Sequence, residues 1–359
     1  MSYKLLMRVC LVLFSLVIGA CGDDKEDITI RTGPKATLTE TLDTLLAANI
    51  ADDEPGMIIA VWQNGTLLYK GMKGLAREDM TLNENTGFRL ASVSKTFTAI
   101  AVLKLYEQGL ISLDDSILAY IPEFSATWRD ITIHHLLSHQ SGIPDFYNDK
   151  KATKILPDGI TNNNIVRYFV TNPSLEFSPG TQADYSNSGY VILAEIVARI
   201  SGVPFTTFMQ ANVFSELGMQ DSYLYNEYTQ LRFDSALNMA STEHIFGVNF
   251  FATGTASQVS SMQDMLIFVE AIMNEQILQQ ETINLMFTRH AELFDGYGYG
   301  VIYFNPLLDI YGHTGGNDGF RTMYAINKEK NAFLITLGNG GDTMPEQDYI
   351  AELVGEFLE

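Results

Sequence analysis

Apolar residues follow a helical period in several separate stretches of the chain. In residues 38–49 leucines recur every three or four positions, and Thr37 with Glu40 forms the pattern of a capping box. Residues 96–109 are mostly apolar, which is typical of a buried helix. The same period predicts further helices at residues 131–139, 163–170, 189–200, 262–273 and 347–358.

Short β-rich runs lie near both ends of the chain. Residues 57–62 and 66–69 flank an Asn-Gly pair, Asn64-Gly65, and this order predicts a β-hairpin. The C-terminal runs are residues 299–304, 320–326 and 332–338.

The order of these elements predicts how the chain is organised. One α/β domain would be assembled from residues 37–110 and 290–359, and a helical domain of residues 111–289 would interrupt it. Residues 147–162 and 223–249 show no clear period, and we expect them to border a cleft.

The first twenty residues have the pattern of a signal peptide. Lys4 and Arg8 precede an apolar stretch, residues 9–20, that is too short to span a membrane. The stretch ends in Cys21 and resembles the bacterial lipobox, in which this cysteine is lipidated. The alternative is an ordinary signal peptide with an incidental cysteine. We expect a protein of the bacterial cell envelope that touches the membrane only through the lipid, with residues 21–36 as a tether.

The charge of the chain excludes several classes of partner. It carries 43 acidic and 22 basic residues in 359, a formal net charge of −21. So acidic a chain is repelled by nucleic acid, and it has no basic patch for anionic lipid. Loss of Cys10 with the signal would leave Cys21 alone, without a disulfide framework or a thiol nucleophile. Nothing in the sequence sets the oligomeric state, and a monomer is the working expectation.

Ser92 and Lys95 form the first chemical motif. They stand three residues apart at the start of the apolar helix, so the lysine amine can reach the serine hydroxyl. A serine hydroxyl needs such a base to become a nucleophile, and the Ser92 N–H would lie at the positive end of the helix dipole. The alternative is that Ser92 is an exposed helix cap, but Lys95 lies in an apolar run where an unpaired ammonium is costly.

Tyr185 and Asn187 form the second motif, directly before a predicted helix. An ammonium beside the Tyr185 phenol would lower its pKa and make it a candidate base. Asn187 would orient Lys95 or a substrate carbonyl. The alternative is a packing tyrosine followed by a helix cap.

A glycine-rich stretch beside a β segment forms the third motif, His313-Thr314-Gly315-Gly316. Here an edge strand would present the Gly316 N–H as an oxyanion donor opposite the Ser92 amide. Thr314 and His313 would face the leaving group or a substrate carboxylate. The alternative is a plain glycine-rich hairpin.

The histidines at positions 134, 135 and 139 raise the question of a metal site. His135 and His139 have zinc-ligand spacing, but no glutamate lies between them to serve as a base. His139 is more simply a helix-end hydrogen-bonding residue. The sequence also lacks a phosphate-binding loop and a dinucleotide fingerprint.

Together, the motifs Ser92-Val93-Ser94-Lys95, Tyr185-Ser186-Asn187 and His313-Thr314-Gly315 resemble the serine β-lactamase and penicillin-binding-protein superfamily, in its class C β-lactamase and D-alanyl-D-alanine carboxypeptidase/esterase branch. The resemblance runs from about residue 41 to the C-terminus. It implies an α+β fold, with an antiparallel sheet flanked by helices and an inserted helical domain.

The resemblance also implies a chemistry. Ser92 would form an acyl-enzyme with an amide or ester, Lys95 and Tyr185 would share the acid/base work, and the amides of Ser92 and Gly316 would hold the oxyanion. No metal and no organic cofactor would be needed. His313 departs from the lysine of class C β-lactamases, so the permanent cation that would steer a β-lactam carboxylate is missing. We therefore expect a carboxypeptidase- or esterase-like hydrolase, with a class C-like β-lactamase or a non-turnover penicillin-binding sensor as alternatives.

Overall fold

A six-stranded antiparallel sheet joins the two ends of the chain. In the computed structural model, which describes residues 36–157, 159–226, 235–237, 251–305, 309–317 and 319–358, its strands follow the order β2-β1-β11-β10-β9-β8. The strands are β1 (Met57–Gln63), β2 (Thr66–Lys73), β8 (Ile302–Asn305), β9 (Ile310–Asn317), β10 (Phe320–Asn327) and β11 (Ala332–Gly338).

Strand β1 shows why this sheet lies at the centre. All seven of its residues are buried, because both faces of the strand are covered. Met57, Ile59 and Val61 pack in one hydrophobic cluster, whereas Ile58 and Trp62 pack in the other. The alternation places one cluster on each side of the sheet.

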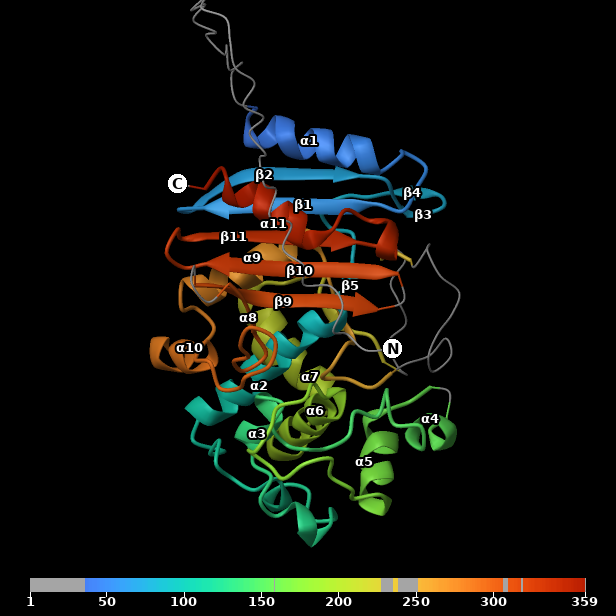
Figure 1. Ribbon diagram of the computed structural model, residues 1–359, viewed down its shortest axis with the longest axis vertical. Coiled ribbons are helices and arrows are strands. Elements are labelled where there is room, and N and C mark those ends of the chain that lie inside the picture. The colour runs from blue at the N-terminus through green and yellow to red at the C-terminus, as the bar shows by residue number, and fades with distance from the viewer. Residues whose placement is uncertain are drawn as a thin grey trace, which may run out of the picture. The chain divides into compact units, whose positions relative to one another are not determined.

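The first face carries helices from both chain ends. Leu42 and Leu46 of α1 (Leu38–Asn49) and Ile350 and Val354 of α11 (Gln347–Gly355) belong to the cluster of Ile59. Figure 1 shows α11 crossing the front of the sheet and α9 behind it.

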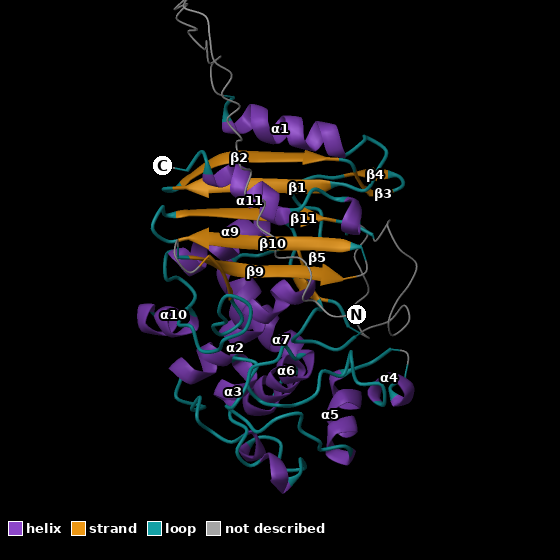
Figure 2. Ribbon diagram, in the orientation of Figure 1, coloured by secondary structure: helices purple, strands orange, loops and turns teal. Residues whose placement is uncertain are grey.

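Most of the other helices belong to the second cluster: α9 lies behind the sheet, and α2, α3, α5, α6 and α7 lie beyond β9 (Figure 1; all helices are purple in Figure 2). Central among them are α2 (Ser94–Glu107), α6 (Asn187–Ser201) and α9 (Met262–Met273), which share one large cluster with the sheet. The others are α3 (Ile133–Leu137), α4 (Ala152–Ile155), α5 (Asn162–Thr171), α7 (Phe205–Met209), the π-helix η4 (Gln210–Phe214), α8 (Ser215–Leu217), α10 (Gln280–Met286) and the short 3-10 turns η1 (Ala91–Val93), η2 (Ile117–Ala119), η3 (Ala126–Trp128) and η5 (Gly341–Thr343).

Two small sheets complete the fold. One pairs β3 (Leu75–Arg77) with β4 (Met80–Thr81). The other has the order β5-β7-β6 and joins β5 (Phe88–Arg89), β7 (Gln258–Ser260) and β6 (Tyr223–Leu224). These strands have two or three residues each, so no alternating pattern marks them in the sequence.

Most predicted elements are confirmed. The hairpin at Asn64-Gly65 has φ values of 51° and 79°, as a two-residue turn of type I′ requires. The α+β class is confirmed, with a sheet built from both chain ends and flanked by helices. Residues 37–359 form one unit, and the predicted signal, Cys21 and the tether up to residue 35 lie outside the described residues.

The length and composition of the described helices bear on whether one could span a membrane. No single helix there has both the length and the apolar composition to cross a bilayer, and one sharply bent pair, Asn187–Ser201 with Phe205–Leu217, meets those two criteria when combined.

Candidate active site

Ser92 lies in the 3-10 turn η1, which connects β5 to the start of α2. The turn begins with Ala91 at a φ of 47°, a conformation that residues other than glycine rarely adopt. The helix begins at Ser94, two residues before the predicted apolar run that starts at residue 96. The Ser92 amide therefore still precedes a helix N-terminus, where N–H groups lack intrahelical acceptors.

Lys95 is fully buried beneath Ser92. Its Nζ atom lies 3.3 Å from Ser92 Oγ, 2.8 Å from Asn187 Oδ1, 3.1 Å from the Thr255 carbonyl oxygen and 2.8 Å from Thr255 Oγ1. Burial lowers the pKa of Lys95 to about 7, against a smaller opposing effect of the Asp145 charge. Near neutral pH much of this amine is therefore unprotonated and able to accept a proton.

The neighbours of Lys95 determine where its lone pair points. A neutral amine has two N–H donors, and the Asn187 amide oxygen and both Thr255 oxygens are available as acceptors. The Thr255 hydroxyl donates to Asn187 Oδ1 at 2.5 Å, so its own proton is committed. The Ser92 hydroxyl is then the neighbour left to donate to the lone pair, as a general base requires.

Asp145 fixes the orientation of the Asn187 amide. Asn187 donates its side-chain Nδ2 to Asp145 Oδ2 at 3.1 Å and its backbone N–H to Asp145 Oδ1 at 3.3 Å. With the nitrogen engaged in this way, the Asn187 oxygen faces Lys95, as its predicted orienting role requires. Burial raises the pKa of Asp145, although hydrogen bonds from Asn187 and the Lys95 charge oppose that rise.

The structure contradicts the predicted pKa shift of Tyr185. The ring centroid lies 4.8 Å from Lys95 Nζ, and the phenol hydrogen-bonds to Ser92, so the predicted proximity is present. Burial nevertheless raises the pKa of Tyr185, because it disfavours the phenolate more than the Ser92 hydrogen bond favours it. At neutral pH Tyr185 is a proton donor, and Lys95 is the better base.

His313 and Thr314 lie on opposite faces of β9. His313 is buried, with its Nδ1 donating to the Thr314 carbonyl at 2.6 Å and its Nε2 3.2 Å from the Tyr297 hydroxyl. Burial and the Lys95 charge lower the pKa of His313 to about 3, so it carries no charge at neutral pH. Gly315 lies against η1, where a Cβ would come within 2.1 Å of the Leu90 carbonyl oxygen.

The strand register directs the Gly316 N–H away from the sheet. Asn339 N–H donates to the Gly56 carbonyl at 3.1 Å, so the next residue along β11, Gly338, bonds to its other partner, Arg321 of β10. Gly316 pairs with Arg321 from the opposite side and therefore turns its N–H away from β10. Among the described residues β8 pairs only with residues 310–312 of β9, which leaves this edge uncovered, as the predicted oxyanion role requires.

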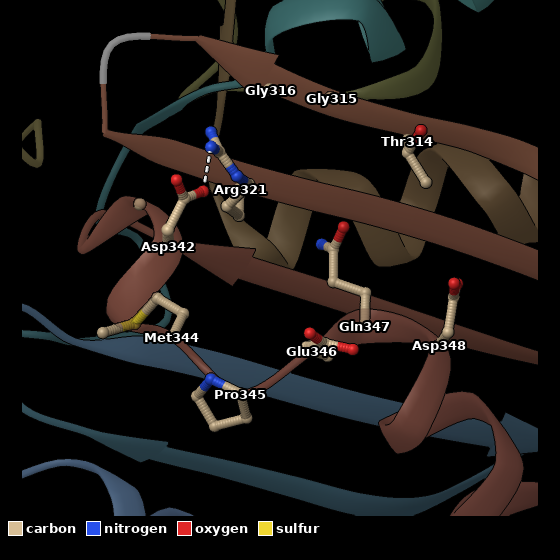
Figure 3. A pocket seen from close by; sticks show the side chains of 11 residues that line it. Thr314, Gly315, Gly316, Arg321, Asp342, Met344, Pro345, Glu346, Gln347 and Asp348 are labelled. Carbon is tan, nitrogen blue, oxygen red and sulfur yellow. Dashed lines mark hydrogen bonds and ion pairs between the residues drawn. The ribbon is translucent and has the colours of Figure 1, made fainter. Parts of the chain in front are cut away.

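A cavity of about 450 Å³ lies on the Thr314 side of β9, across from the start of α11 (Figure 3). Its wall holds the ion pair of Arg321 with Asp342, and Glu346 and Asp348 add two further carboxylates. The charges around this cavity are therefore mainly negative.

A second cavity, of about 480 Å³, lies beside Tyr185. Its charged lining residues are four carboxylates and one ammonium: Asp145, Asp149, Glu176, Asp184 and Lys150. Burial raises the pKa of Glu176, and repulsion by Asp184 and Asp149 adds to the effect. Carboxylates that repel one another in this way favour a cationic or neutral occupant over an anionic one.

The histidines of the discounted zinc pattern have other partners. His135 Nδ1 accepts from the Thr132 N–H at 3.2 Å in a capping box, and His134 Nδ1 lies 2.7 Å from the Tyr299 hydroxyl. In the described part of the chain no three histidine, cysteine, aspartate or glutamate side chains are grouped so that they could hold a metal ion.

Sequence reasoning missed Thr255, Asp145 and the contacts of His139. Thr255 lies 160 positions from Lys95, in a stretch without a motif. Asp145 directly follows Ser141-Gly142-Ile143-Pro144, and a carboxylate beside this turn was the one available signal.

Comparison with known proteins places this geometry in context. A family model described as Beta-lactamase matches residues 39–359. Penicillin-binding protein 4* of Bacillus subtilis (strain 168) is 28% identical over 316 residues, which cover 79% of this chain and 68% of that protein. Protein flp of Staphylococcus aureus (strain NCTC 8325 / PS 47) is 24% identical over 88% of this chain and 65% of its own length. The chain thus spans about two thirds of these longer relatives. Esterase EstB of Burkholderia gladioli is 33% identical over 181 residues, 46% of each chain.

Solved structures share the fold. The octameric penicillin-binding protein homologue from Pyrococcus abyssi matches with a TM-score of 0.75 and 25% identity, covering 88% of this chain and 77% of that one. The D-amino acid amidase of Ochrobactrum anthropi SV3 matches with a TM-score of 0.70 and 23% identity, covering 88% of this chain and 96% of that one.

Proposed function

The chain belongs to the beta-lactamase family and is a serine hydrolase, and from this premise we propose that Ser92 forms an acyl-enzyme with an amide or ester substrate. The observation that carries the proposal is the buried Lys95 amine, with a pKa near 7, at 3.3 Å from the Ser92 hydroxyl. Burial alone makes this amine a base at neutral pH, and the hydroxyl is the neighbour that can give it a proton.

The proposed acylation is one sequence of proton and bond transfers. Lys95 accepts the Ser92 proton as the serine oxygen bonds to the substrate carbonyl carbon, and the N–H groups of Ser92 and Gly316 hold the resulting oxyanion. Tyr185 then donates its proton to the leaving amine or alcohol as the carbon–leaving-group bond breaks, and Lys95 returns a proton to the phenolate. Water attacks the acyl-enzyme by the reverse route and releases the acid.

The charges beside the reacting groups favour substrates without a carboxylate. Both cavities that border the site are lined mainly by acids, and the neutral His313 offers no counter-charge. A β-lactam or a peptide with a C-terminal carboxylate brings a negative charge close to this region, whereas simple esters and amides do not. We therefore propose an esterase- or amidase-like substrate range rather than a β-lactamase or D-alanyl-D-alanine carboxypeptidase range.

A panel of substrates tests the proposal. It contains nitrocefin, a D-Ala-D-Ala peptide, D-amino-acid amides and short p-nitrophenyl esters, each assayed for kcat/KM. We expect the esters or amides to exceed both anionic substrates by about tenfold or more, since like charges oppose binding. A kcat/KM for nitrocefin above that of every ester and amide would overturn the substrate proposal. An acyl-enzyme that forms on all substrates and never decays would favour the sensor instead.

A further inference from the structure

His139 lies between the end of α3 and the segment that carries Tyr185. It follows the helix in the left-handed region, with a φ of 60°, and only 1% of its surface is exposed. A side chain in this conformation is uncommon, although histidine and asparagine adopt it more readily than most residues. Such a residue persists where its surroundings require it, often at a functional site.

Two hydrogen bonds that His139 accepts come from the residues on either side of Tyr185. The His139 carbonyl accepts from the Asp184 N–H at 3.0 Å, and its ring Nδ1 accepts from the Ser186 N–H at 3.1 Å. The two donors are the backbone N–H groups of the residues directly before and after Tyr185. His139 thus fixes the backbone immediately before and after Tyr185.

The His139 ring also packs against the tyrosine rings of the site. Its centroid lies 4.4 Å from that of Tyr185, 4.6 Å from that of Tyr297 and 5.1 Å from that of Tyr190. Movement of the Tyr185 ring toward this side is therefore blocked, and Lys95 Nζ lies 4.8 Å from the same ring.

The hydrogen bond to Nδ1 determines which nitrogen of the His139 ring carries the proton. Since Nδ1 accepts a hydrogen bond, the proton of the neutral ring is on Nε2, which has no partner among the described residues. Burial lowers the pKa of His139, and the charge of Lys95 lowers it further. The ring therefore remains neutral and keeps its bond to Ser186, although one buried N–H is left unpaired.

We propose that His139 is a positioning residue that fixes the Tyr185 phenol at the Ser92 hydroxyl. This inference rests on the proposed acyl transfer, because it assigns His139 no contact with substrate. It explains why a strained and incompletely hydrogen-bonded histidine occupies this position. A misplacement of the phenol by about 1 Å would cost about 100-fold in rate.

Two substitutions test the proposal in the full chain. His139→Gly accepts a φ of 60° but removes the ring and its acceptor, whereas His139→Asn accepts the same φ and offers an amide oxygen to the Ser186 N–H. We expect His139→Gly to lower kcat on a p-nitrophenyl ester by about 100-fold with KM nearly unchanged. His139→Asn should recover most of that loss. The control is His134→Asn, five residues earlier, which should keep the wild-type kcat.

The outcomes separate this inference from the proposed function. Slow labelling of folded His139→Gly by a fluorophosphonate at Ser92 would support both. Wild-type kcat in folded His139→Gly, or an equal loss in both variants, would overturn the positioning role alone. If His139→Gly fails to fold, a kcat for folded His139→Asn more than about 100-fold below wild type would overturn it as well. Absence of labelling in the wild-type protein would overturn the proposed function, whatever the variants do.

Discussion

Two neighbouring regions of the site differ in whether their ionisable groups are buried or exposed to solvent. Around Lys95 the groups are buried, and burial brings the amine to a pKa of about 7. In the cavity beside Tyr185, Glu176 and Asp184 are exposed to solvent, and for Asp184 no neighbouring cation forms an ion pair within the described residues. We call the buried groups around Lys95 the dry region and the cavity beside Tyr185 the wet region. The contrast indicates that desolvation sets reactivity in the dry region, whereas unpaired carboxylate charge sets substrate choice in the wet region.

Asp145 lies on the border between the two regions. It orients Asn187 toward Lys95 and also lines the cavity. The predictions below separate the regions, since changes in the dry region should affect every substrate alike, whereas changes in the wet region should affect substrates according to their charge.

The largest effect is expected from Ser92→Ala, which removes the nucleophile of the dry region. Turnover of every substrate should fall by about 10⁴-fold or more, as measured by steady-state ester hydrolysis. Ser94→Ala is the matched control, because among the described residues the Ser94 hydroxyl accepts from the Gln258 N–H at 3.1 Å and bonds to no side chain of the site. Equal losses in the two variants would show that the effect is structural.

The next effect is the pH dependence of acylation. The neutral form of Lys95 is the reactive one, and its pKa is lowered to about 7, so kcat/KM should rise with pH through about 7 and then level off. At pH 5 only about 1% of the amine is neutral, which predicts a rate about 100-fold below the plateau. A rate that begins to rise only above pH 9 would mean that the lysine keeps its ordinary pKa.

A smaller effect is expected from Thr255→Val, which keeps the shape of the side chain but removes one acceptor from Lys95. We expect kcat/KM to fall about tenfold, the equivalent of one hydrogen bond. Because the ammonium loses an acceptor, the inflection of the pH profile should move to lower pH. Thr255→Ser keeps the hydroxyl and should retain both the rate and the inflection, and an inflection that moves upward in Thr255→Val would contradict the account.

The smallest effect belongs to the wet region. Replacing Glu176 with Gln and Asp184 with Asn should raise kcat/KM for an anionic ester relative to a neutral one by about threefold at low salt, and less at high salt. Glu216→Gln is a control, because Glu216 pairs with Lys104 at the surface. An equal change for both esters would indicate that the carboxylates act through the dry region instead.

The sequence predicts those parts of the site that local spacing determines. Ser92 and Lys95 meet because they lie three residues apart at the start of a helix. The contacts of Thr255 and of Asp145 with this pair depend on how distant segments pack, which no local pattern encodes. The predicted fall in the pKa of Tyr185 was wrong for a related reason, because a sequence shows a neighbouring charge but not the depth of burial.

The third motif also depended on a feature that the sequence does not show, the register of the strands. The glycine-rich composition indicated a close backbone approach, which Gly315 makes against Leu90. The alternation of side chains then separates His313 from Thr314, although the two were expected to face the same group. Only the observed pairing shows that Gly316 has its N–H on the open edge.

Mapping of the covalent intermediate tests the central claim most directly. The full chain is incubated with a p-nitrophenyl ester, quenched during the first turnover, digested with trypsin and analysed by mass spectrometry. The account predicts that the acyl group is attached to Ser92 within the peptide of residues 90–95, and that Ser94→Ala still carries it. Ester turnover with the acyl group on another residue, or with no acyl-enzyme at any time during the reaction, would contradict the account.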